Sequence, residues 1–313
     1  MRQLTIAIFL VAISFSCTAK QEKPTQPQKL EREAPAKSYR FSYVQPPAMA
    51  TEEQKFLYVR DHYWDNFDFA DTLWTTKADT TEMMRAYIGY IVNFVGPTDQ
   101  EPMRKLMQRA SVSKKMLEYF ASLSEKVLHD PNSPYRSDEL YIPVLEAQLA
   151  SPHLDKYEKM APQYDLRIVS QNRINQPAND FDYTLKSGKT HNLYSLDRDF
   201  IIVYINNPGC TMCREIAQAL KQSQLISDLQ REGRLQILAI YPDENLDEWH
   251  KHYADIPDEW INSYDKGCLI GRGNLYNINA IPALYLLNKD KIVLVKDSTN
   301  VGEVEFVLSQ QIK

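Results

Sequence analysis

Residues 200–213 read FIIVYINNPGCTMC: six apolar residues, a short polar turn, and two cysteines three positions apart. A continuous, β-branched apolar run is typical of a strand buried on both faces of a sheet. A second such run occupies Leu235–Tyr241, and the residues between the two runs, 211–231, are numerous enough for a helix that crosses over the sheet. A strand–helix–strand unit of this kind predicts parallel strands.

The rest of the C-terminal part extends this sheet. Two apolar runs at 283–287 and 292–295 flank the turn residues 288–290, which is typical of an antiparallel hairpin. A last helix is expected over 301–312. Parallel and antiparallel strands together, with helices on both faces, predict an α/β fold with a mixed sheet for residues 173–313.

The two cysteines after the first strand carry the chemical signal. Cys210 falls at the N-terminus of the expected helix and Cys213 one turn inside it, a spacing at which a dithiol can open and close without moving the backbone. The helix N-terminus presents free N–H groups and a positive dipole end to Cys210, which favours its thiolate form. Cys210 is therefore the candidate nucleophile, and the more shielded Cys213 would resolve the mixed disulfide that Cys210 forms with a partner.

Residues 173–313 resemble the thioredoxin fold and, within it, the envelope thiol-disulfide oxidoreductases related to TlpA and ResA. The segment 177–181 (PANDF) is similar to the opening segment of that family, the strands and cysteines follow in the same order, and 280–283 (AIPA) stands where the family has its cis-proline. The resemblance implies that Pro282 is cis and that the backbone of Ile281 binds an extended substrate strand. It also implies disulfide exchange without a bound cofactor.

Two positions depart from that family. The residues before Cys210 are Pro208 and Gly209, where the family usually has Trp, and the buried Asp that thioredoxin keeps six residues ahead of its first cysteine is replaced by Tyr204. A different proton acceptor or slower exchange is implied. Glu215 lies near the cysteines in sequence and is a candidate, although an acid in the first turn of a helix is more often an exposed partner of the dipole.

Residues 1–17 predict export. An apolar run of ten residues, 4–13, follows a short positive start and is too short to anchor the chain across a bilayer, which is typical of a secretory signal. Ser16 and Cys17 come next, and this arrangement resembles the lipobox of bacterial lipoproteins, in which the signal is cleaved ahead of the cysteine and that thiol is lipidated. We expect a periplasm-facing lipoprotein of the bacterial cell envelope, tethered to the membrane through Cys17; plain secretory cleavage is the alternative. Residues 18–37, rich in Pro, Gln, Lys and Glu, predict a disordered tether.

Residues 38–172 predict an all-helical domain of unknown function. Apolar residues recur at helical spacing in segments that open with polar residues such as Thr51 and Thr80. Further helices are expected over 102–110, 113–128, 137–149 and 154–168. We interpret the aromatic residues of this part as core rather than as a ligand groove, and His62 beside Asp61 as a surface histidine rather than half of a catalytic pair. The aromatic residues concerned are Tyr58, Tyr63, Trp64, Phe67, Phe69 and Trp74.

Composition and spacing exclude further classes of function. The chain has 313 residues, with 36 Lys and Arg against 41 Asp and Glu and no basic block, so nucleic-acid binding is not expected. No second CxxC accompanies the cysteines, and His250 and His252 would point to different faces of a helix, so we expect no metal site. Cys268 is left as a single thiol, and its apolar neighbours Leu269 and Ile270 favour a buried position.

Two functions from different classes follow. The first is a thiol-disulfide oxidoreductase, acting as reductase or isomerase on cysteine-containing envelope proteins and drawing electrons from a membrane donor, as the resemblance implies. The second is a partner- or ligand-binding lipoprotein whose helical domain binds and whose thioredoxin-like domain is a scaffold with a structural disulfide. Solvent access separates the two, because a redox-active pair exposes one sulfur whereas a structural pair usually buries both.

Overall fold

The computed structural model describes residues 37–278 and 280–312, and the described residues from Tyr39 onward belong to one unit. The expected signal segment 1–17, the lipidation site Cys17, and all but the last residue of the expected tether 18–37 lie outside the described residues. Within the described ranges, no helix combines the length and the apolar composition needed to cross a bilayer.

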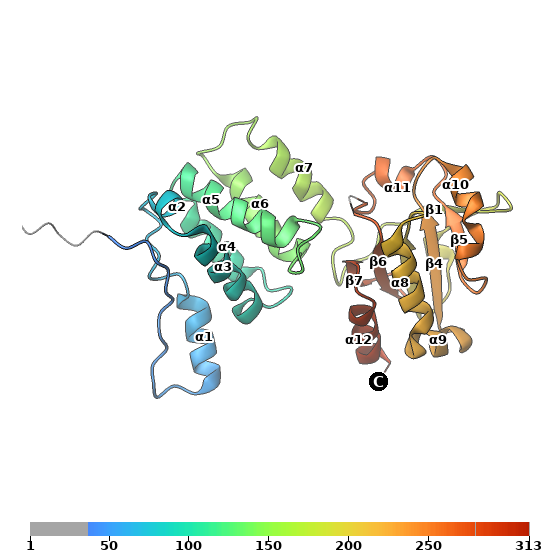
Figure 1. The fold of residues 1–313 in the computed structure, drawn as a ribbon, viewed down its shortest axis with the longest axis horizontal. Coiled ribbons are helices and arrows are strands. Elements are labelled where there is room, and N and C mark those ends of the chain that lie inside the picture. The colour runs from blue at the N-terminus through green and yellow to red at the C-terminus, as the bar shows by residue number, and fades with distance from the viewer. Residues whose placement is uncertain (1–36, 279, 313) are drawn as a thin grey trace, which may run out of the picture. The chain divides into compact units, whose positions relative to one another are not determined.

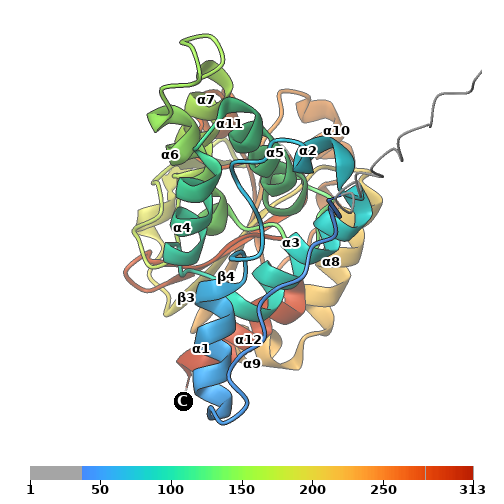
Figure 2. The same cartoon turned by 90° about the vertical axis from the view of Figure 1, so that its left-hand side faces the viewer.

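The first half of this unit is all helical, as expected (Figures 1 and 2). Its elements are α1 (Glu52–His62), α2 (Trp74–Lys77), α3 (Thr80–Phe94), α4 (Glu101–Ala110), α5 (Lys114–Ser124), the π-helix η1 (Glu125–His129), α6 (Asp138–Ala150) and α7 (Met160–Val169). Helix α6 contacts α4, α5, η1 and α7, so it forms the centre of the helical part.

Side-chain caps explain where several of these helices begin. Thr51 accepts a hydrogen bond from the Gln54 N–H while its own N–H donates to the Gln54 side chain, which forms a capping box at α1. Asp79 caps α3, one residue before the expected start, and Ser137 caps α6. Each cap satisfies backbone N–H groups that have no partner inside the helix.

Two of the expected helices differ in the structure. The helix expected over 154–168 begins later, at the start of α7, because the Asp155 carboxylate accepts hydrogen bonds from the N–H groups of Tyr157 and Glu158 and holds this segment in a turn. The helix expected over 113–128 is divided between α5 and η1. Helix α2 was not expected, since four residues are too few to show a helical period.

The aromatic residues of the helical part form its core. Tyr58 is half-buried, and the others are fully buried. Trp64 packs edge-on against Phe120 with 5.4 Å between ring centroids, and Phe67 does so at 5.3 Å. The interpretation as core is confirmed for Tyr63, Trp64, Phe67, Phe69 and Trp74, whereas Tyr58 lies outside the core cluster.

His62 lies at the surface and is paired with a different acid from the one that the sequence suggested. Its Nδ1 lies 2.7 Å from a carboxylate oxygen of Asp65, which also accepts a hydrogen bond from Arg109. Asp61 instead accepts from Arg60. A half-exposed histidine in an ion-pair network is an ordinary surface arrangement, as we expected.

The second half folds around a seven-stranded mixed sheet with the order β2-β1-β5-β4-β3-β6-β7. Strands β3, β4 and β5 are parallel to one another, and the remaining pairs are antiparallel. The strands are β1 (Asp182–Leu185), β2 (Thr190–Asn192), β3 (Phe200–Ile205), β4 (Leu235–Tyr241), β5 (Ile261–Tyr264), β6 (Ala283–Asn288) and β7 (Val293–Ser298). This is the thioredoxin-like α/β fold that the sequence predicted.

Alternate residues of β3 explain how both faces of the sheet are covered. Ile202 and Tyr204 face an apolar cluster that includes residues of α8 (Thr211–Gln222), α9 (Gln224–Arg231) and α12 (Val301–Gln311). Ile201 and Val203 face a second cluster that includes Ile270 of α11 (Leu269–Arg272). The single crossover helix expected over 211–231 is two helices, because Ser223 ends α8 and caps α9.

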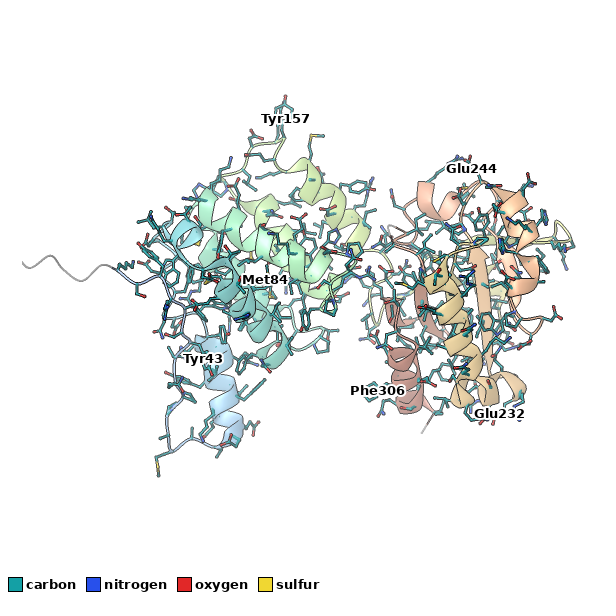
Figure 3. All side chains as sticks on the ribbon, viewed as in Figure 1. Tyr43, Met84, Tyr157, Glu232, Glu244 and Phe306 are labelled. Atoms are coloured by element: carbon teal, nitrogen blue, oxygen red, sulfur yellow. The ribbon has the colours of Figure 1, made fainter. Side chains whose placement is uncertain are left out.

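The carboxyl ends of the parallel strands are where the unexpected elements lie. Figure 3 labels Glu232 and Glu244 just outside the two ends of β4, with Glu244 at the carboxyl end. Helix α10 (Leu246–Lys251) and the 3₁₀-helix η3 (Tyr253–Asp255) follow there, and β5 adds a further parallel strand. These short, polar segments show no periodic pattern of apolar residues from which they could be predicted.

Candidate active site

The two cysteines lie at the carboxyl end of β3. That strand ends at Ile205, and residues 206–209 lead to Cys210, the N-cap of α8. Strand β6 is antiparallel to β3 with Ala283 opposite Ile205, so the residues just before β6 reach the same end of the sheet. The Ile281–Pro282 peptide bond there is cis, as the resemblance implied. Cys210 and Ile281 pack against the same apolar cluster.

The two thiols differ in exposure although they are one helical turn apart. Both are free, and Cys210 is half-buried whereas Cys213 is only 4% exposed. The sulfur of Cys210 accepts a hydrogen bond from the backbone N–H of Cys213 at 3.2 Å, which places it at the positive end of α8. Met212 between them is 52% exposed. One sulfur is therefore presented at the surface and the other is held beneath it.

Burial controls the protonation of Cys213. Desolvation raises the pKa of this thiol to about 12, and the neighbouring Cys210 adds to the increase. The N–H of Asn207 points at the Cys213 sulfur at 3.5 Å and opposes the shift only in part. Cys213 is therefore a thiol near neutral pH and needs a proton acceptor before it can act as a nucleophile.

Tyr204 occupies the position where thioredoxin has its buried acid, and it has a different role here. Its hydroxyl donates a hydrogen bond to the carbonyl oxygen of Cys213 at 2.6 Å. Burial raises the pKa of this phenol well above its usual range, so it stays protonated. Tyr204 thus holds the first turn of α8 on the sheet and does not take up a proton.

A cavity of about 250 Å³ opens beside Cys213. Its walls come from β3, the loop before α8, α8 itself, α10, η3 and β5. The side chains that matter for chemistry are those of Cys213, Tyr204, Arg214, Lys221, His252 and Asp255. Glu215, the proton-transfer candidate from the sequence, is exposed on α8 and lines a different cavity, together with Ser223 and Glu305.

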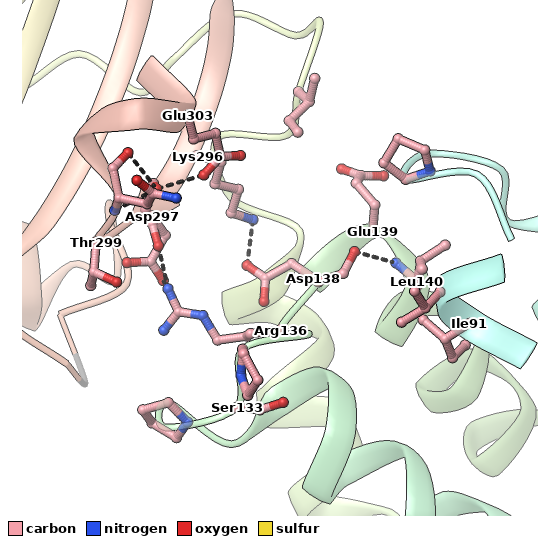
Figure 4. Close-up of a pocket in the computed structure, with 18 of the residues that line it drawn as sticks. Ile91, Ser133, Arg136, Asp138, Glu139, Leu140, Lys296, Asp297, Thr299 and Glu303 are labelled. Carbon is pink, nitrogen blue, oxygen red and sulfur yellow. Dashed lines mark hydrogen bonds and ion pairs between the residues drawn. The ribbon is translucent and has the colours of Figure 1, made fainter. Parts of the chain in front are cut away.

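A larger cavity of about 690 Å³ lies where the start of α6 meets β7 (Figure 4). Two buried ion pairs cross it: Arg136 lies 3.0 Å from the Asp297 carboxylate, and Lys296 lies 2.8 Å from that of Asp138. Burial raises the pKa of Asp297 to about 7, although Arg136 acts in the opposite direction. These pairs join the helical part to the sheet.

Cys268 is placed differently from the expectation. It is half-buried, with a left-handed backbone (φ +55°), and it directly precedes the short helix α11 without capping it through its side chain. This turn directs Ile270 into the core and leaves Leu269 at the surface, 55% exposed. The expected full burial of Cys268 is therefore wrong, because only one of its two apolar neighbours faces inward.

Comparisons with known proteins cover both halves of the chain. A family model described as "Domain of unknown function (DUF5106)" matches residues 16–172, which is half of the 313 residues. No curated protein matches the chain. Among solved structures, a thioredoxin-like protein from Bacteroides caccae is 44% identical with a TM-score of 0.81, and the match covers 87% of this chain and 99% of that one.

Other solved structures match less than half of this chain. The C-terminal domain of an uncharacterized protein from Bacteroides fragilis is 46% identical, with 44% of this chain and 98% of that chain covered and a TM-score of 0.43. The thioredoxin domain of a thiol-disulfide oxidoreductase from Bacteroides vulgatus is 14% identical, with 45% and 99% covered and a TM-score of 0.39. The family model and the Bacteroides caccae structure carry the assignment: the chain belongs to the DUF5106 family and is a thioredoxin-like protein.

Proposed function

We propose that this protein is a thiol-disulfide oxidoreductase that acts through Cys210 and Cys213. The observation that carries the proposal is the unequal placement of the two sulfurs, with Cys210 half-exposed at a helix N-terminus and Cys213 buried one turn behind it. Cys210 attacks a disulfide of the partner and forms a mixed disulfide, and Cys213 then attacks Cys210 and releases the partner. A structural disulfide would need neither the exposed sulfur nor its position at the helix end.

The substrate is proposed to be an extended segment of a cysteine-containing envelope protein. Ile281 and the cis Pro282 lie at the same end of the sheet as Cys210, where a substrate backbone could pair with the Ile281 backbone. Met212 offers exposed apolar surface next to the reactive sulfur. A pairing of this kind binds main chain and tolerates many sequences.

The cellular setting belongs to the same proposal. The closer relationship to TlpA- and ResA-type proteins, the lipid anchor at Cys17 and the periplasm-facing position rest on the sequence. A membrane electron donor would return the dithiol to its reduced form, because the chain carries no electron source of its own in this scheme. The domain limits 38–172 and 173–313 remain predictions of the same kind.

Selective alkylation tests the proposal. The reduced full chain with Cys17→Ser and Cys268→Ser is pulsed with iodoacetamide at pH 7, and the labelled sites are read by mass spectrometry. We expect Cys210 to be labelled at least ten times faster than Cys213, because Cys210 is the more exposed thiol and burial raises the pKa of Cys213 to about 12. Equal and slow labelling of both thiols would contradict the proposal and favour a structural pair.

A further inference from the structure

The reaction proposed above leaves one step without a proton acceptor. Before Cys213 can attack the mixed disulfide it must lose its proton, and burial raises the pKa of this thiol and so keeps it protonated near neutral pH. Tyr204 is protonated and donates to a carbonyl, and Glu215 faces another cavity. The acceptor must therefore come from elsewhere in the fold.

The cavity beside Cys213 offers a route for this proton. With a volume of about 250 Å³ it has room for several water molecules beside Cys213. Arg214 and Lys221 on that lining are cations and cannot accept a proton in their usual state. The lining residues with a side chain able to accept one near neutral pH are His252 and Asp255.

His252 and Asp255 are arranged as a pair. The Nδ1 of His252 lies 2.8 Å from a carboxylate oxygen of Asp255, so this nitrogen donates and the Nε2 is left as the acceptor. Glu248, one turn earlier in α10, lies 3.7 Å from the Nε2. The histidine side chain is 26% exposed, so it is open to water but fixed at one end. A carboxylate that orients an imidazole in this way is a general device of acid–base catalysis.

We infer that His252, oriented by Asp255, accepts the proton of Cys213 through water in this cavity; the inference rests on the proposed function. The Cys213 thiolate then attacks the sulfur of Cys210, the bond between Cys210 and the substrate sulfur breaks, and the Cys210–Cys213 bond forms. The substrate leaves as a thiolate and takes up the proton that His252 held. The dithiol loses two electrons, and the substrate disulfide gains them.

A general base makes this exchange depend on pH. Asp255 and Glu248 lie 2.8 Å and 3.7 Å from the two ring nitrogens of His252, and the other charged or titratable groups on the cavity lining are Arg214, Lys221, Tyr204 and Cys213. Resolution of the mixed disulfide should therefore speed up as His252 loses its proton and should level off above that point. Without His252 the rate should instead keep rising tenfold per pH unit, because hydroxide alone would remove the proton.

The test is a single-turnover measurement on the full chain with Cys17→Ser and Cys268→Ser. Reduced protein is mixed with glutathione disulfide, and acid-quenched samples are analysed by mass spectrometry for the glutathione adduct on Cys210 between pH 5.5 and 9. We expect His252→Gln to resolve the adduct at least ten times more slowly at pH 7 and to lose the levelling-off of the pH profile. Asp255→Asn should slow resolution to a smaller extent with the same change of profile.

His250→Gln is the matched control, since His250 lies on α10 beside Trp249 but does not line the cavity. It should resolve the adduct as the wild type does. Far-UV circular dichroism reports whether a variant is folded, and Asp255→Asn tests the inference if His252→Gln does not fold. A wild-type rate and pH profile in both variants would overturn the inference alone, whereas a wild type that forms neither the adduct nor the Cys210–Cys213 disulfide would overturn the proposed function as well.

Discussion

The helical part and the carboxyl end of the sheet use burial in opposite ways. In the helical part, Trp64 and Phe120 are closed off in an aromatic core, and His62 is tied into a surface ion-pair network. At the end of the sheet, Cys213 is buried to a similar degree but lines a cavity that His252 also lines. Burial alone therefore does not mark a reactive group; in the proposed function, the cavity gives the proton of the buried thiol a route.

Removing one of the two sulfurs at the end of the sheet tests the contrast between the two regions most strongly. Cys210→Ser should abolish disulfide exchange, because no nucleophile is left at the surface, while Cys213→Ser should accumulate a mixed disulfide that is not resolved. Both variants should unfold at nearly the wild-type temperature. Exchange assays with mass spectrometry of the trapped adduct check this, and exchange by the Cys210→Ser variant would exclude Cys210 as the nucleophile.

A large cavity made in the helical core should have the opposite consequence: stability should fall while the reaction of Cys210 stays unchanged. Phe120 is fully buried and its ring contacts Trp64, Phe67 and Phe69, so Phe120→Ala should lower the free energy of unfolding by about 3–5 kcal/mol. The reaction of Cys210 with glutathione disulfide, measured per folded molecule, should not change. Urea unfolding and single-turnover kinetics give the two numbers, and a slower Cys210 reaction would show that the two regions are coupled.

A buried carboxyl group between the two regions, that of Asp297, predicts a dependence of stability on pH. Because the pKa of Asp297 is about 7 in the folded protein and near 4 in an unfolded chain, the folded state holds this proton more tightly. The contribution of this tighter proton binding to the free energy of unfolding is present at low pH and is lost as the pH rises from about 4 to 7. Wild-type stability should therefore fall over this range relative to Asp297→Asn, whose side chain does not titrate. Parallel curves for the two proteins in urea unfolding would contradict this.

The smallest effect is expected at Tyr204. Tyr204→Phe removes the hydroxyl that donates to the Cys213 carbonyl and should cost about 1 kcal/mol of unfolding free energy, as for a typical internal hydrogen bond. Disulfide exchange should persist, since the phenol is not the proton acceptor. Loss of exchange in a folded Tyr204→Phe protein would assign the proton to Tyr204 instead of His252.

The two regions also differ in how much the sequence predicts. The bounds of β3 and β4 follow from nearly continuous apolar runs, interrupted only at Gln236 of β4, because a strand buried on both faces needs apolar residues at almost every position. The cis peptide bond at Pro282 was predicted because this proline stands where the thioredoxin-like family has its cis-proline. The start of α7 was missed because the Asp155 turn depends on a local hydrogen bond rather than on periodicity.

The candidate site was only partly predictable for a physical reason. Cys210 and Cys213 stand in one short motif, but His252 belongs to no motif and is 39 positions away from Cys213 in the chain. His252 lines the cavity because α10 and η3 follow β4, and β4 ends at the same end of the sheet at which α8 begins. Glu215 is close in sequence but is directed away by the helical period, since residues two apart on a helix face different sides.

The reduction potential of the Cys210–Cys213 pair tests the central claim most directly. It is measured by titration of the full chain, with Cys17→Ser and Cys268→Ser, against glutathione buffers of known potential. A value between about −120 and −270 mV, with a single reactive thiol at Cys210, is the predicted result for a pair that exchanges with partners. A potential below about −300 mV with an unreactive Cys210 would contradict the account and make the pair a structural disulfide.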